Sequence, residues 1–174
     1  SNQQKKIASV IITSDKCYDP TYKHIFKEND PLGGIDPYSA SKACAEIIYR
    51  SYYQSKLKLN KKSKSCTVRA GNVIGGGDWS KNRLLPDVIN FINNDKNIVI
   101  RNPKANRPWQ HVFEPILGYI ILSMDLYKDK LDGESFKIGP STKKKMNVLS
   151  LIKKIISLSK SKSKIKIIAN KKYK

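Results

Sequence analysis

The chain has 174 residues, of which 39% are hydrophobic and 28% are charged, so it is long enough for a core of moderate size under a hydrated surface. Its 34 Lys and Arg residues outnumber 14 Asp and Glu residues, which gives a formal net charge of +20 at pH 7. No apolar run approaches the roughly 18 residues that a membrane-spanning helix needs, and residues 1–6 show no signal-peptide pattern. We therefore expect a cytoplasmic protein without a membrane partner.

The excess positive charge is almost entirely lysine, with clusters at 56–64, 143–145 and 153–174. Specific nucleic-acid readers combine arginine forks with aromatic side chains on one face, and no such stripe occurs in the sequence. A generally lysine-rich composition is the simpler interpretation, so we expect no specific nucleic-acid partner. A basic protein whose tail after Ser159 attaches weakly to polyanions stays open as an alternative.

The three cysteines, Cys17, Cys44 and Cys66, are an odd number without paired spacing, and the two histidines, His24 and His111, lie far apart. The number and spacing of these residues argue against a disulfide framework and against a zinc site. We expect buried or unreactive thiols and no metal ion.

Ile7–Ile12 is a continuous apolar run, which predicts a strand buried on both faces of a parallel sheet. The run ends in Thr-Ser-Asp-Lys (13–16), at the carboxyl edge where open α/β sheets bind ligands. Residues 17–37 contain several Pro and Gly residues and read as a loop. Asp36 and Pro37 then open a long helix, predicted over about 38–57.

Strand and helix alternate through the rest of the chain, which predicts the α/β class. The expected strands are 65–70, 97–101, 135–138 and 164–168, with a short extended piece at 109–112, and the expected helices are 84–93, 114–127 and 148–158.

Tyr38 and Lys42 are four residues apart on the predicted helix and therefore share a face. A nearby ammonium favours the phenolate form of a tyrosine, which suits that tyrosine to move a proton while a hydride moves elsewhere. The pattern alone is weak, because Tyr52 and Lys56 repeat it in the same helix. The first pair gains weight because it begins the helix, close to the polar end of the first strand.

Glycines 75–77 let the backbone approach a ligand closely, although they also suit a flexible loop. Arg83, Arg101 and Arg107 flank this region, and the planar guanidinium fork suits a diphosphate. Surface ion pairs are the alternative for all three arginines.

Together these residues resemble the extended short-chain dehydrogenase/reductase superfamily and, within it, the CDP-glucose 4,6-dehydratases. The likeness spans most of residues 7–140. It is carried by Thr-Ser-Asp-Lys-Cys-Tyr (13–18), Asp-Pro-Tyr-Ser-Ala-Ser-Lys (36–42), Arg-Ala-Gly-Asn-Val-Ile-Gly-Gly-Gly-Asp-Trp (69–79), Arg-Leu-Leu-Pro-Asp (83–87) and Arg-Pro-Trp-Gln-His-Val (107–112).

The resemblance implies a partial Rossmann-like parallel sheet with a small α/β substrate-binding subdomain. It implies a later part of the Rossmann-like domain over residues 1–72. A mainly substrate-binding region follows over 73–174, with the chain returning in part to the sheet.

The resemblance also implies a lyase that converts CDP-glucose to CDP-4-keto-6-deoxyglucose with NAD. Hydride leaves C4 of the hexose while Tyr38 accepts the hydroxyl proton, water is lost across C5–C6, and hydride returns to C6. In that scheme Ser14 hydrogen-bonds the C4 oxygen, Asp15 protonates the leaving hydroxyl, and Lys16 occupies the position of the C5 base. Lysine can be a base only when its neutral form is favoured, as by desolvation or by a second lysine nearby.

By the same resemblance, Tyr38, Lys42 and Ala70 contact the cofactor, whereas Asn72, Arg83 and Arg107 hold the phosphates or sugar of a nucleotide-sugar substrate. A homo-oligomer is expected for the complete protein.

The superfamily's Gly-x-x-Gly-x-x-Gly turn, which holds the cofactor pyrophosphate at a helix N-terminus, does not occur in this sequence. A sheet without that half leaves the edge of residues 7–12 open to pairing with another chain. We expect the chain alone to bind NAD weakly and to be inactive. Another superfamily dehydratase or epimerase and a non-catalytic remnant stay open as alternatives.

Overall fold

The computed structural model describes residues 5–140 and 146–168, and it confirms the α/β class. Residues 1–73 with 110–139 form one compact unit, and residues 74–109 with 140–174 form a second. The expected division at residues 72 and 73 stays a prediction about the domains of the complete protein. The lysine cluster at 143–145 and the tail beyond residue 168 lie outside the described residues.

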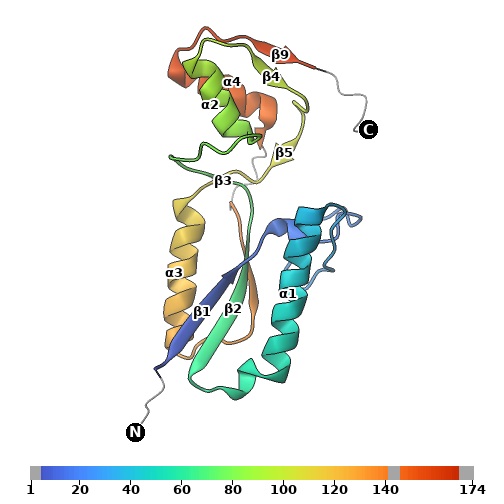
Figure 1. The fold of residues 1–174 in the computed structure, drawn as a ribbon, viewed down its shortest axis with the longest axis vertical. Coiled ribbons are helices and arrows are strands. Elements are labelled where there is room, and N and C mark those ends of the chain that lie inside the picture. Colours follow the sequence, from blue (N-terminus) through green and yellow to red (C-terminus); the bar gives the residue numbers. More distant parts are fainter. Residues whose placement is uncertain (1–4, 141–145, 169–174) are drawn as a thin grey trace. The chain divides into compact units, whose positions relative to one another are not determined.

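The first unit is built on a parallel sheet in the order β1-β2-β7. Helix α1 covers one face of this sheet and helix α3 covers the other (Figure 1). The elements are β1 (Ile7–Ile12), the 3₁₀ turn η1 (Asp15–Cys17), α1 (Pro37–Ser55), the 3₁₀ turn η2 (Leu57–Leu59), β2 (Ser63–Ala70), β6 (Gln110–His111), α3 (Phe113–Tyr127) and β7 (Ser135–Ile138). A two-residue strand, β3 (Val73–Ile74), pairs with β6.

The two faces of this sheet differ in polarity. On the α3 side, Cys66, Val68 and Leu126 are fully buried, and Ala8 and Val10 pack against them. On the α1 side, the buried side chains include Thr13, Thr67 and Arg69, which hydrogen-bond to a glutamate of α1. The apolar face supplies the hydrophobic core, and the polar face fixes the position of α1.

Strand β1 is half-buried, with Ile7 and Ile12 more than half exposed, so the expectation of a strand buried on both faces is wrong. The reason is its place in the sheet. Within the described part of the chain, β1 is an edge strand that pairs on one side only, with β2.

The second unit has a separate core, formed by Val88, Ile98, Ile100, Val148 and Ile152. Its elements are α2 (Leu84–Asn93), β4 (Ile98–Ile100), β5 (Asn106–Arg107), β8 (Met146–Asn147), α4 (Val148–Ser159) and β9 (Ile165–Ile167). Strand β4 pairs in parallel with β9, and β5 pairs antiparallel with β8. Trp109 belongs to this core, and its indole N–H donates to the carbonyl oxygen of Met146 at 3.1 Å.

The cysteines fit the expectation of unreactive thiols at two of three positions. Cys17 and Cys66 are buried, and burial raises the pKa of each thiol to about 11, whereas Cys44 is exposed. Within the described ranges, no group of three or more His, Cys, Asp or Glu side chains could hold a metal ion. No helix in the same ranges has the length and apolar character to cross a membrane.

Candidate active site

The carboxyl end of β1 turns directly into η1, and the residues of this turn form a small hydrogen-bonded cluster. Ser14 is the N-cap of η1 and is buried; its hydroxyl oxygen accepts from the backbone N–H of Lys16 at 3.2 Å. The same hydroxyl donates to a carboxylate oxygen of Asp15 at 3.3 Å. The sequence folds this way because a serine side chain satisfies a backbone N–H that a helix start leaves without a partner.

Helix α1 begins beside this turn because its first residues are strongly capped. Asp36 is the N-cap, and its carboxylate accepts from the backbone N–H of Ser39 at 3.0 Å and from its hydroxyl at 2.6 Å. Pro37 follows at the first helical position, where its missing N–H costs nothing. The side-chain and backbone hydrogen bonds of Ser39 lower the pKa of Asp36, and the charge of Lys16 contributes in the same direction. Lys16 therefore lies within electrostatic range of the start of α1.

Packing joins the same two segments. Cys17 and Tyr18, which follow the turn, form a buried cluster with Ala43 of α1. The strand-end groups 14–16 and the helix start are thus parts of one packed region within the first unit.

Tyr38 and Lys42 occupy the first two turns of α1 on a shared face, with the ammonium 5.8 Å from the centre of the phenol ring. Tyr38 is more than half exposed. The repeat at Tyr52 and Lys56 has the same ammonium-to-ring distance, 5.8 Å. The pair geometry alone therefore does not distinguish the two pairs, which differ in that Tyr38 lies at the start of the helix.

A buried network behind this region was missed by the sequence reasoning. The carboxylate of Glu46, which is 2% exposed, accepts hydrogen bonds from Arg69 and Thr67 at 2.8 Å each and from Thr13. The guanidinium of Arg69 also donates to the hydroxyl of Tyr18 at 3.1 Å and to the carbonyl oxygen of Glu28 at 2.7 Å. The sequence feature that could have indicated this network is a glutamate at a buried position of the helix together with an arginine within a strand.

The charge state of this network follows from its contacts. Burial works to raise the pKa of Glu46, but the hydrogen bonds from Arg69 and from Thr13 outweigh it, and the pKa lies below its usual value. Burial likewise opposes the charge of Arg69, yet its hydrogen bonds to Glu46 and Tyr18 raise the pKa further. Both groups are therefore ionised at neutral pH.

The remaining predicted residues fall in two places. Ala70 ends β2, and the carbonyl oxygen of Asn72 accepts from the backbone N–H of Gln110 at 3.2 Å, so both belong to the first unit. Arg83 and Arg107 belong to the second unit, and both are exposed. A guanidinium nitrogen of Arg83 lies 3.4 Å from the carboxylate of Asp78, and Arg107 pairs with Met146 between β5 and β8.

Comparison with known proteins identifies the family of the chain. The model of the NAD dependent epimerase/dehydratase family matches residues 2–139. The chain is 42% identical over 157 residues to the CDP-glucose 4,6-dehydratase of Salmonella typhimurium, a match that covers 87% of this chain and 44% of that protein.

Two solved structures share the fold. The dTDP-glucose 4,6-dehydratase of Bacillus anthracis, solved with NAD, superposes with a TM-score of 0.76 at 24% identity, covering 92% of this chain and 49% of that chain. The UDP-N-acetylglucosamine 4-epimerase of Methanobrevibacter ruminantium gives a TM-score of 0.79 at 19% identity, covering 96% and 51% respectively. The chain thus spans about half the length of these proteins. From the extent of the family match we conclude that the chain belongs to the NAD dependent epimerase/dehydratase family.

Proposed function

We propose that this chain is the part of an NAD-dependent CDP-glucose 4,6-dehydratase that carries the proton-transferring groups and a share of the substrate site. The observation that carries the proposal is the packing of the Ser14–Lys16 turn beside the start of α1, where Tyr38 and Lys42 lie. The identity of 42% to the Salmonella enzyme supports CDP-glucose as the substrate. A cytoplasmic location and a homo-oligomer of the complete protein stay predictions.

The residues present fit one end of NAD. The phenol of Tyr38 and the ammonium of Lys42 supply a donor pair suited to the hydroxyls of a ribose, and Ala70 ends the neighbouring strand without a bulky side chain. A glycine-rich pyrophosphate turn is absent from the sequence. When bound, the cofactor supplies the site that stores the hydride between its departure from C4 and its return to C6.

Tyr38 takes the proton of the C4 hydroxyl, with the ammonium of Lys42 beside it on the same helix face. The Ser14 hydroxyl hydrogen-bonds the C4 oxygen, whose ketone form acidifies the C5 proton. Asp15 then protonates the hydroxyl that leaves C6.

Lys16 is the candidate base at C5, and it lies within electrostatic range of Asp36 at the start of α1. An epimerase needs neither an acid for C6 nor a base for C5, so Asp15 and Lys16 favour dehydration over epimerisation.

The experiment is a chimera in which the matched segment of the Salmonella enzyme is replaced by the corresponding residues of this chain. We expect turnover of CDP-glucose, read from the alkaline absorbance of the 4-keto product. Tyr38→Phe is expected to reduce kcat by about a thousandfold, within the usual range for loss of an acid–base group, with little change in substrate binding.

Tyr52→Phe is the matched control, because this tyrosine has the same spacing and the same lysine distance. It is expected to leave kcat unchanged. Turnover that survives Tyr38→Phe, or a folded chimera that binds CDP-glucose but forms no keto product, contradicts the proposal.

A further inference from the structure

The positive charge of the chain is unevenly divided between its two units. Residues 140–174, which belong to the second unit, contain 12 lysines and no arginine, aspartate or glutamate. The first unit holds 11 of the 14 acidic residues, and three of its lysines, Lys6, Lys64 and Lys130, each pair with an aspartate. The net positive charge is therefore concentrated in the second unit, which is where a polyanion is attracted most strongly.

Strands β4 and β9 give this charge a defined surface. They form a parallel two-stranded ribbon in which Val99 lies beside Lys166. Helices α2 and α4 lie on one side of the ribbon (Figure 1), where Ile98, Ile100 and Ile165 belong to the core of the second unit. Because successive side chains of a strand point to opposite faces, Val99 and Lys166 project from the other side, and both are exposed.

A row of lysines continues along this outer side. Lys164 lies two residues before Lys166 and is exposed as well. Just before β9, the hydroxyls of Ser161 and Ser163 are hydrogen-bonded to each other at 3.0 Å, so Lys162 between them points to the opposite side. Lys162, Lys164 and Lys166 therefore form a row with a spacing of about 6.6 Å, twice the rise per residue of a strand.

The row has no counter-charge of its own. Arg101, which directly follows β4, is also exposed, and we name the surface formed by Val99, Arg101, Lys162, Lys164 and Lys166 the β4–β9 face. Within residues 5–140 and 146–168, none of its four cations has an ion-pair partner. The acidic residues of the second unit, Asp78, Asp87 and Asp95, lie outside both strands. The four charges are thus available to an external anion.

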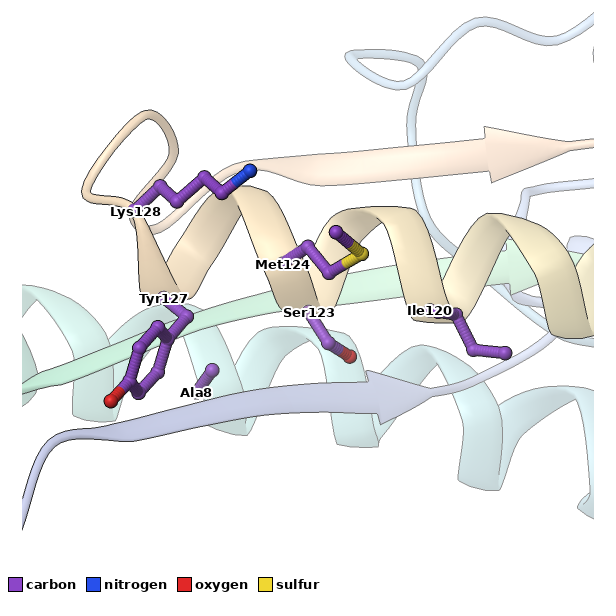
Figure 2. Close-up of a pocket in the computed structure, with 6 residues that line it drawn as sticks. All are labelled: Ala8, Ile120, Ser123, Met124, Tyr127 and Lys128. Carbon is purple, nitrogen blue, oxygen red and sulfur yellow. The ribbon is translucent and has the colours of Figure 1, made fainter.

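A hollow in the first unit is a poorer match for such a partner. It has a volume of about 570 Å³ and lies between β1 and α3 (Figure 2). Its lining residues are Ala8, Ile120, Ser123, Met124, Tyr127 and Lys128. This lining is mainly apolar and offers a single cation, so a phosphate group would lose hydration there with little compensation.

We propose that the β4–β9 face binds a nucleic-acid strand through its phosphate backbone, without preference for the base sequence. Long lysine side chains adapt to a line of phosphates, and each contact releases counterions from the strand. The face carries one arginine and no aromatic side chain, so it lacks the groups that read or stack bases. This mode of binding agrees with the expectation of no specific nucleic-acid partner, and it does not depend on the proposed function.

An anionic membrane is a less suitable partner for this face. Peripheral membrane binding combines lysines with a large apolar surface that enters the bilayer interface. The aliphatic side chains at and beside the β4–β9 face, Val99 and Ile168, are 40% and 46% exposed and belong to a narrow ribbon. A polyanion that needs only cations fits the face better.

The test uses the 174-residue chain and fluorescein-labelled single-stranded DNA of about 20 nucleotides, longer than a typical single binding site. One strand is all thymine and the other has a mixed sequence. Fluorescence anisotropy measures binding between about 50 and 200 mM salt. At the lowest salt we expect a dissociation constant of about 1–100 μM, the usual range for sequence-independent binding, and a difference below about twofold between the strands.

A double variant, Lys164→Gln with Lys166→Gln, removes two cations from the face. We expect it to reduce the slope of log affinity against log salt by about 1.4, because each contact to a single strand contributes about 0.7. That change is about sevenfold in the ratio of the affinities at about 50 and 200 mM salt. Far-UV circular dichroism checks that the fold is kept.

Two matched controls make the same change of charge elsewhere. Lys153→Gln with Lys154→Gln alters exposed positions of α4 in the same unit and should leave the slope unchanged. Lys171→Gln with Lys172→Gln, at positions outside the described residues, applies the same test to the end of the chain. On the unaltered protein, NMR amide shifts caused by the thymine strand should be largest at residues 97–101 and 162–168.

Four results overturn the inference. They are a dissociation constant above about 1 mM at the lowest salt, slopes that the α4 variant reduces as much as the β4–β9 variant, a loss confined to the variant at residues 171 and 172, and binding to phosphatidylserine vesicles without binding to DNA. The last result identifies a membrane surface as the partner. Turnover of CDP-glucose is measured separately, so failure here leaves the proposed function untouched.

Discussion

Glu46 and Arg69 form a charged pair in a position where burial is expensive. Their side chains are 2% and 4% exposed, and the nitrogen-to-oxygen distance is 2.8 Å. Removing two charges from water costs several kcal/mol per ion, which the pair recovers only with further hydrogen bonds. The hydroxyls of Thr13 and Thr67 donate these bonds to Glu46, and the hydroxyl oxygen of Tyr18 accepts one from Arg69. The pair therefore fixes α1 to the carboxyl ends of β1 and β2.

The substitution Glu46→Gln is expected to destabilise the chain by about 3 kcal/mol at pH 7, because it leaves the buried guanidinium of Arg69 without its counter-charge. Asp129→Asn, which removes the partly exposed pair with Lys6, is the control and is expected to cost less than about 1 kcal/mol. Urea unfolding of the three proteins measures both values. Equal losses for the two variants contradict the role assigned to the buried pair.

The pH dependence of the Glu46 effect has a definite sign. The folded-state pKa of Glu46 lies below its unfolded value, so its contribution is fully present above the unfolded pKa of about 4.3. The contribution is lost as pH falls through the lower folded-state pKa. The stability gap between the unaltered chain and Glu46→Gln should therefore be constant above about pH 5 and shrink below pH 4. A gap that widens on acidification contradicts this assignment.

At the scale of elements, helix α1 depends on the loop that precedes it. A Cβ atom at Gly34 would lie 2.3 Å from the backbone nitrogen of Ala40 and 2.5 Å from the carbonyl carbon of Ser39. The loop thus crosses in direct contact with the first turn of α1, the turn that carries Tyr38. Only glycine allows this approach, because the obstructing atoms belong to the helix backbone.

Gly34→Ala is expected to destabilise the first unit by about 1–3 kcal/mol, the usual cost of overpacking, because the loop and the first turn of α1 must separate. Gly139→Ala is the control in the same unit, since a Cβ atom there meets nothing within 4 Å. Thermal unfolding followed by circular dichroism compares the two. In NMR spectra, Gly34→Ala should also shift the resonances of Tyr38 and Ser39 more than those of Tyr52. A harmless Gly34→Ala contradicts the close approach.

The sequence patterns predicted the main elements well where periodicity and capping agreed. The strand at 135–138 matches β7, the helix at 84–93 matches α2, and the expected helix at 38–57 is α1, Pro37–Ser55, followed by a 3₁₀ turn. The two-residue strands β5 and β8 were missed, because such short segments carry no period. The Glu46–Arg69 pair was also missed, since pattern reasoning assigns charged residues to the surface unless tertiary structure supplies partners. Whether Ser14–Lys16 and Tyr38 act on one substrate stays a prediction.

At the scale of the whole molecule, two compact units have separate cores, and the proposed site residues are divided between them. Ser14–Lys16, Tyr38, Lys42, Ala70 and Asn72 belong to the first unit, whereas Arg83 and Arg107 belong to the second. The proposed division of labour therefore assigns the proton transfers to one unit and part of the substrate phosphate binding to the other.

The residues that this chain carries predict which ligands it binds in isolation. A glycine-rich turn and a helix N-terminus hold the pyrophosphate of a dinucleotide. Because this sequence lacks that turn, we expect the 174-residue chain to bind NAD with a dissociation constant above about 1 mM, equivalent to less than about 4 kcal/mol. Isothermal titration calorimetry measures this directly.

CDP is the informative second ligand for that calorimetric experiment, because Arg83 and Arg107 lie in this chain and the proposed substrate carries a diphosphate. We expect CDP to bind more tightly than NAD, because the guanidinium fork suits a diphosphate. We also expect Arg107→Ala to weaken the binding of CDP and to leave the heat of NAD addition unchanged, because Arg107 is not among the residues proposed to contact the cofactor. Binding of NAD at micromolar concentration by the chain alone contradicts this. It would mean that the cofactor is held by contacts other than a glycine-rich turn.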